Sequence, residues 1–177
     1  MNLEMKKTII TSIFIAFGWG SSQAQVAIGK EEVLNSSVSL EFADTEARGL
    51  LLPWVDSEST VADVVNGTLV YDANDHKVKV KYEGGWKDLS IDETGTLGLA
   101  SQPTTESSNA QVRIGGTETD TTAGILVLAD TDKAMILPKV INTDEVINPA
   151  AGMMVYVESK ALLAVFNGSV WTFWSYE

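Results

Sequence analysis

The feature that most constrains this chain is an internal repeat. Residues 43–53 read ADTEARGLLLP and residues 129–138 read ADTDKAMILP, so an acidic turn, a basic residue, an apolar run and a proline recur in one order. The stretch VAIG at 26–29 returns as VRIG at 112–115, 86 positions later, and Trp86 returns as Trp171, 85 positions later. A register held to within one residue over most of the chain predicts two copies of one structural unit.

Short apolar runs alternate with turn residues in both copies, which is typical of strands. Val, Ile, Tyr and Trp are common in these runs and favour strands. The expected strands of the first copy are 26–28, 38–42, 50–54, 68–71, 78–82 and 86–89, and those of the second are 112–114, 125–128, 135–141, 153–157, 162–166 and 171–176. One short helix per copy is expected, near 60–64 and 144–146. The predicted class is all-β, with two tandem copies of a small antiparallel β repeat built from hairpins.

The chain divides into four predicted segments. Residues 1–24 form a signal peptide, 25–90 the first β repeat, 91–111 a polar linker and 112–177 the second β repeat. The segment 91–111 is rich in Ser, Thr, Asp, Glu and Gly and has too few apolar residues to fold alone. Two domains joined by this linker are one interpretation. A single merged fold, with the connection running over its surface, is the other.

The N-terminus predicts export. Lys6 and Lys7 precede an apolar run, and small residues ending at Ala24 form a cleavage site before Gln25. The run is shorter than the roughly 20 residues that a spanning helix needs, so no membrane span is expected after signal removal. We expect the protein to be extracellular, on the cell surface or in the periplasm. Cysteine is absent, which excludes disulfides and thiolate metal sites.

The charge of the exported chain excludes one class of partner. Removal of residues 1–24 leaves 10 basic and 23 acidic residues, a net charge of −13. A surface of this sign repels nucleic acids, so no nucleic acid partner is expected.

The sequence predicts neither an enzyme nor a cofactor. His76 is the single histidine and lies in a predicted turn, and nothing resembles an activated nucleophile. The acidic turn 72–75 is similar to the start of a calcium loop, but Lys77 stands where that loop needs glycine. A polar hairpin turn is therefore the preferred interpretation, and no metal site is predicted.

Several motifs together resemble a known kind of protein. The stretch AQVAIG at 24–29, the run TDKAMILP at 131–138, PAAG at 149–152 and FNGSVW at 166–171 are similar to the repeat of secreted Bacteroidota-type proteins of tail-fibre or adhesin type. The first copy matches through RGLLLP at 48–53 and VNG at 65–67. The resemblance implies a surface or fibre protein, commonly trimeric, and implies no catalytic residues.

One difference between the copies predicts an interface. The strand 77–82 alternates, so Lys77, Lys79 and Lys81 are expected to face water. The matching strand carries Ala161, Leu163 and Val165 at these positions. Both of its faces are apolar and need a cover from the chain or from a partner. We predict that these three residues lie in a subunit interface, most simply of a homotrimer.

The tryptophans divide into two groups. Trp86 and Trp171 recur at matching positions, which favours a structural role. Trp54 and Trp174 have no aromatic counterpart and are the candidates for contact with a surface protein or glycan.

The sequence thus predicts a secreted, non-enzymatic structural or interaction protein of surface, fibre or adhesin type. Two alternatives stay open: a small secreted carbohydrate-binding module, and a periplasmic accessory subunit of an outer-membrane complex.

Overall fold

The computed structural model describes residues 25–97, 110–117 and 119–175. The predicted signal peptide and most of the predicted linker lie outside this range. The described residues form short strands and two single-turn 3-10 helices, with no α-helix among them. The fold is all-β, and its parallel pairs of short strands make it β-solenoid-like. None of the helices in the described part is long and apolar enough to cross a membrane.

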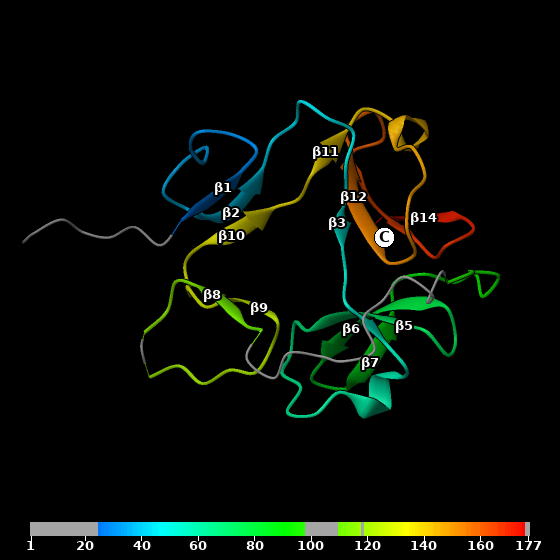
Figure 1. Cartoon of the computed structure of the whole chain (residues 1–177), viewed down its shortest axis with the longest axis horizontal. Helices are drawn as coiled ribbons and strands as arrows, with labels where there is room; N and C mark the ends of the chain where they lie inside the picture. The colour runs from blue at the N-terminus through cyan, green and yellow to red at the C-terminus, as the bar shows by residue number, and fades with distance from the viewer. Residues whose placement is uncertain (1–24, 98–109, 118, 176–177) are drawn as a thin grey trace, which may run out of the picture.

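The first half of the chain contributes seven strands and the 3-10 helix η1 (Figure 1). They are β1 (Val26–Ile28), β2 (Val38–Phe42), β3 (Leu50–Leu51), β4 (Trp54–Val55), η1 (Glu58–Thr60), β5 (Leu69–Asp72), β6 (Lys77–Tyr82) and β7 (Gly85–Asp88).

The second half contributes the same succession. It comprises β8 (Val112–Ile114), β9 (Leu126–Leu128), β10 (Ala134–Ile136), β11 (Lys139–Val140), the 3-10 helix η3 (Thr143–Glu145), β12 (Met153–Val157), β13 (Leu162–Phe166) and β14 (Trp171–Trp174).

Strand pairing follows one pattern in both halves. The order β4-β5-β6-β7 corresponds to β11-β12-β13-β14, in each case with one parallel pair followed by two antiparallel pairs. The partners Trp54 and Tyr71 correspond to Lys139 and Tyr156, an offset of 85. β1 pairs with β2 in parallel as β8 pairs with β9, with an offset of 86. These offsets are the ones at which the sequence motifs recur.

The two halves also pair with each other. β10 lies parallel to β2 and completes a three-stranded sheet with β1. β3 pairs antiparallel with the start of β12, so that Leu51 lies opposite Met153. In Figure 1 β10 leads into β11 across the upper part of the molecule, and β3 runs down through the middle.

The main core is built from both halves. It joins Leu52, Tyr71, Val78 and Leu89 of the first half to Ala151, Met154 and Val165 of the second. The Tyr71 hydroxyl donates to the backbone carbonyl of Asn167 at 2.7 Å, and Tyr71 is fully buried. A smaller core gathers Val140, Val146, Val155, Val157 and Ala164 within the second half. The two halves therefore share one apolar interior.

The structure corrects two details of the predicted elements. The expected strands 50–54 and 135–141 are each divided in two, because Pro53 and Pro138 lie in them and proline has no N–H to donate to a ladder. The carbonyls of these prolines instead accept from the N–H of Tyr71 and Tyr156. The pairing is also not purely antiparallel, since parallel pairs occur in every sheet.

Candidate functional site

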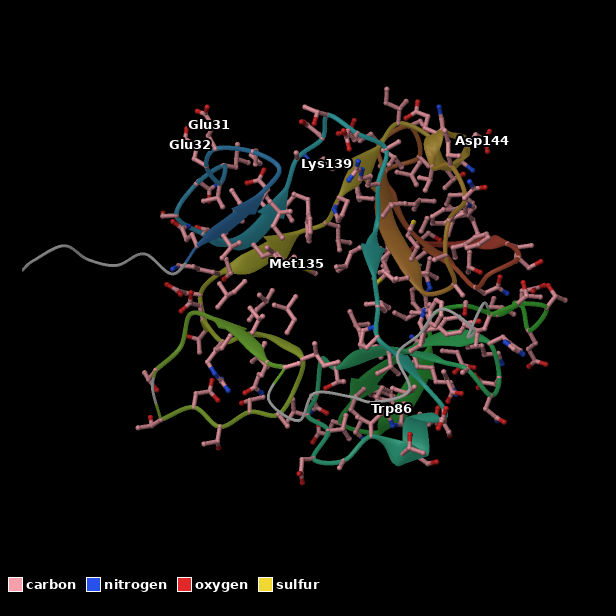
Figure 2. All side chains as sticks on the ribbon, viewed as in Figure 1. Glu31, Glu32, Trp86, Met135, Lys139 and Asp144 are labelled. Carbon is pink, nitrogen blue, oxygen red and sulfur yellow. The ribbon has the colours of Figure 1, made fainter. Side chains whose placement is uncertain are left out.

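The described structure contains an apolar groove of about 840 Å³. One wall consists of β3 with the residues that follow it and of the start of β5. The opposite wall consists of β9 and the segment before it, residues 122–125. Met135 of β10 borders the groove and is labelled in Figure 2. We call this hollow the β3–β9 groove.

The side chains around the β3–β9 groove are unusually exposed for apolar residues. Leu51 is 48% exposed, Leu126 42% and Ile125 63%. Val65, in the loop before β5, also lines the groove and is exposed. By contrast, charged residues such as Glu31, Glu32 and Asp144 lie at the outer rim of the molecule (Figure 2). We therefore treat this exposed apolar surface as a candidate contact site for another molecule.

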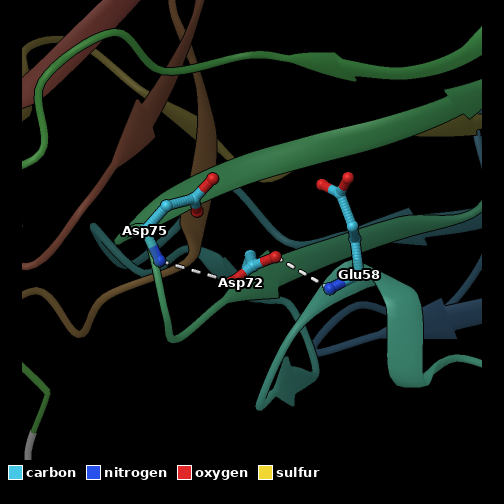
Figure 3. A group of neighbouring side chains, drawn as sticks. All are labelled: Glu58, Asp72 and Asp75. Carbon is cyan, nitrogen blue, oxygen red and sulfur yellow. Dashed lines mark hydrogen bonds between the residues drawn. The ribbon is translucent and has the colours of Figure 1, made fainter.

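A second feature is a cluster of three carboxylates at the β5–β6 turn. Glu58 of η1, Asp72 of β5 and Asp75 of the turn bring one oxygen each within 4.8 Å of one another (Figure 3). The Asp72 carboxylate accepts from the backbone N–H of Glu58 at 2.7 Å and of Asn74 at 2.9 Å. These bonds anchor η1 and the turn to the end of β5.

Lys79 of β6 lies against this carboxylate cluster and offsets part of its negative charge. Its ammonium contacts Glu58, lies 2.6 Å from Asp75 and reaches Asp88 of β7 at 3.5 Å. Burial of Lys79 opposes its charge and lowers its pKa, but hydrogen bonds to Asp75 and Glu58 outweigh this effect and raise the pKa above its usual value. The lysine thus supplies the cation that the carboxylates would otherwise require.

The expectation that the lysines of strand 77–82 face water is wrong for Lys79. Its residue is only 7% exposed, because η1 and the β5–β6 turn fold over this side of β6. Sequence reasoning identified Asp72 and Asp75 but missed Glu58 and Lys79. For Lys79 the available signal was the alternation of lysine with valine next to an acidic turn. Glu58 is distant in sequence, and no local motif points to it.

The predicted interface residues of β13 lie in different environments. Val165 is fully buried in the main core, and Leu163 packs against that core from its border. Ala161 is an exposed turn residue with φ of 52°. The other face of β13 carries Ala164, which is buried in the smaller core. The chain itself covers both faces of the strand, so the burial of Val165 requires no second subunit.

Trp54 and Trp174 both pack against the main core and are half-buried. The Trp54 indole N–H donates to the carbonyl of Ala151 at 2.7 Å, and the Trp174 indole N–H donates to the carbonyl of Leu89. The two tryptophans therefore lie around one core, and the indole hydrogen bond of each connects the two halves of the chain. Lys87 lies over the Trp174 ring at 5.1 Å.

One comparison with known proteins finds a match. Residues 113–176 match the model of a family described as a phage tail like trimerisation region. This segment contains β9, β10 and the whole second four-stranded path, and hence one wall of the β3–β9 groove. No curated protein and no solved structure matches the chain.

Proposed function

We propose that the protein is a non-enzymatic structural component of a surface or fibre-like assembly, and that it works as a homotrimer. The observation that carries this proposal is the match of residues 113–176 to a phage tail like trimerisation region. The β3–β9 groove supports it, because the matched segment contributes exposed apolar side chains such as Leu126 to one wall. Burial of such side chains is the main favourable term in most protein association.

We further infer that the two halves are copies of one trimer-forming repeat. The support is the constant offset at which strand pairs recur, 85 positions in the four-stranded paths and 86 in the parallel pairs. In this proposal residues 25–90 and 112–177 are the repeats, and 91–111 connects them. β3 of the first repeat pairs with β12 of the second, and β10 of the second pairs with β2 of the first. These two pairings then join the repeats into one unit.

We also propose that the protein is exported. The support is the sequence alone, namely the lysines, the apolar run and the small residues that end at Ala24. Intact mass of the protein from the culture medium or periplasm tests this. A mature chain that begins at Gln25 is expected, and retention of residues 1–24 would contradict the proposal.

A carbohydrate-binding role has less support. Stacking on a sugar requires indole faces that are free, whereas Trp54 and Trp174 pack against the core and donate their N–H groups to backbone carbonyls. A glycan array is the direct check of this alternative.

Light scattering coupled to size exclusion tests the assembly at micromolar concentration. We expect a single species of three chains whose mass does not fall on tenfold dilution. High salt should not dissociate it, because an apolar interface is not weakened by screening. A species of one chain under all conditions would overturn the proposed function.

A further inference from the structure

The strand β9 has one neighbour where its counterpart has two. In the first half, β2 lies between β1 and β10, both parallel to it. In the second half, β9 pairs with β8 alone among the described residues. Its remaining edge borders the β3–β9 groove. Two strands alone are marginally stable in water, and a third strand is normally needed.

The strand β3 shows the complementary deficit. It corresponds to β10, since Leu50 and Leu51 precede Pro53 as Met135 and Ile136 precede Pro138. β10 has the parallel partner β2, whereas β3 pairs only with β12, in antiparallel orientation, within the described part of the chain. Within the described residues, one sheet edge therefore lacks a parallel strand and one strand lacks a parallel sheet.

Both open edges also lack protection against pairing. Soluble proteins place charged side chains on open strands because a bare edge invites another strand. β3 and β9 consist of leucine and valine only, whereas the outer strand β7 carries Lys87 and Asp88. The outer strand β14 has lysines over its aromatic rings, with Lys160 at 3.8 Å from Phe173.

We propose that β9 of one copy of this chain pairs in parallel with β3 of a second copy. The existing β2–β10 pair gives the register, because Met135 lies opposite Leu40 and Ile136 opposite Glu41. With the offsets of the two halves, Leu50 of the second copy lies opposite Leu126 and Leu51 lies opposite Val127. The pairing covers Leu51 and Leu126, which are 48% and 42% exposed in the single chain.

This inference rests on the proposed homotrimer and specifies how it forms. The contact joins two different surfaces, β9 on one copy and β3 on the next. Such head-to-tail contacts close into a ring when the rotation between copies permits it. Three copies related by a threefold axis would leave neither edge open. The partner is thus a second copy of this chain, attached by strand addition.

Disulfide trapping tests the pairing directly, because the chain has no native cysteine. Leu126→Cys and Leu50→Cys are made in separate chains of different tag length, co-expressed, purified and oxidised with copper phenanthroline. We expect the mixed dimer as the dominant cross-linked band on a non-reducing gel, with each variant alone remaining uncross-linked. Ile147→Cys is the matched control for Leu126→Cys, since Ile147 is 84% exposed but lies outside both strands.

Each other outcome overturns the inference. If light scattering shows a trimer but no mixed cross-link forms, the trimer uses another surface and the proposed function stands without this pairing. A double variant carries Leu50→Cys and Leu126→Cys in one chain. If it forms an internal disulfide while the separate single variants give no mixed dimer, the groove closes within the chain. If the wild type is monomeric, this inference and the proposed function fall together.

A charge on the open edge gives a second readout that does not depend on oxidation. Leu126→Lys places an ammonium on β9 at a half-exposed position, where the single chain tolerates it. We expect the mass of the assembly in light scattering to fall from that of three chains to that of one, while the circular dichroism spectrum is retained. Ile147→Lys should leave the mass at three chains. A folded Leu126→Lys variant that stays trimeric would overturn the pairing.

Discussion

The hydrogen bond between Tyr71 and Asn167 offers the sharpest test of the shared core. Tyr71 is fully buried, and its hydroxyl donates to a backbone carbonyl 96 positions away at 2.7 Å. Tyr71→Phe removes the donor but keeps the ring, so the carbonyl of Asn167 loses its partner inside the protein. Removing one partner leaves the buried carbonyl unsatisfied, which costs about 1–3 kcal/mol. We expect a loss of about 1–3 kcal/mol in the free energy of unfolding.

Tyr156 is the matched control for this substitution. It occupies the corresponding position of the second half, but it is 36% exposed. Its hydroxyl is accessible to water, so Tyr156→Phe should change the free energy of unfolding by less than about 0.5 kcal/mol. Urea denaturation followed by tryptophan fluorescence measures both variants. Equal losses in the two variants, or no loss in Tyr71→Phe, would refute a shared core held by Tyr71.

Burial of Tyr71 should also make the free energy of unfolding depend on pH in the alkaline range. Burial raises the pKa of Tyr71 to about 12, above the usual value of 10.0. The unfolded chain therefore loses the phenolic proton first, and the stabilisation present below pH 10 declines as pH rises from 10 towards 12. The slope is about 1.4 kcal/mol per pH unit. The difference between wild type and Tyr71→Phe isolates this contribution, and a difference independent of pH would contradict it.

Three further predictions concern the carboxylate cluster and the turns. Lys79→Met leaves Glu58, Asp72 and Asp75 without their cation and should cost about 3 kcal/mol at pH 7. Urea denaturation at pH 7 measures the loss, and an unchanged free energy of unfolding would contradict the role given to Lys79. Millimolar calcium should not raise the melting temperature of the wild type relative to EDTA, because the Lys79 ammonium holds the cluster; a rise of several degrees would show that calcium displaces it. Gly152→Ala should cost about 1 kcal/mol more than Gly67→Ala in thermal unfolding. Both glycines have positive φ, but a Cβ at 152 would lie 2.9 Å from the Tyr71 Cβ whereas one at 67 meets nothing within 4 Å, so equal costs would contradict the packing described around Tyr71.

Much of the strand content could be predicted from local pattern. The alternation in 77–82 and the recurrence of Gly-x-x-x-Tyr ahead of each hairpin predict strands whose positions the structure places within a few residues. Local pattern cannot predict which strands pair over long distances. One of the two partners of β2 is β10, nearly a hundred positions away, and an apolar run such as Met135-Ile136 carries no sign of its partner.

For the candidate sites, too, local pattern predicts the chemistry of a residue but not its long-range contacts. The apolar character of Leu163 and Val165 was evident in the sequence, but their cover comes from Tyr71 and Trp174 of other strands, which composition cannot reveal. Likewise, Lys79 has the sequence pattern of a solvated lysine. Its burial depends on Glu58 approaching from η1, a contact made by tertiary folding. The open edges of β3 and β9 emerge only when the two halves are compared strand by strand.

Native mass spectrometry of the purified protein tests the proposed assembly most directly. The measurement counts chains without labels, and a mixture with a tagged version of the same chain reports the composition of each species. We expect one dominant ion series at three times the mass of the single chain, with four tag compositions after co-expression, two of them mixed. A dominant series at the mass of a single chain would contradict it.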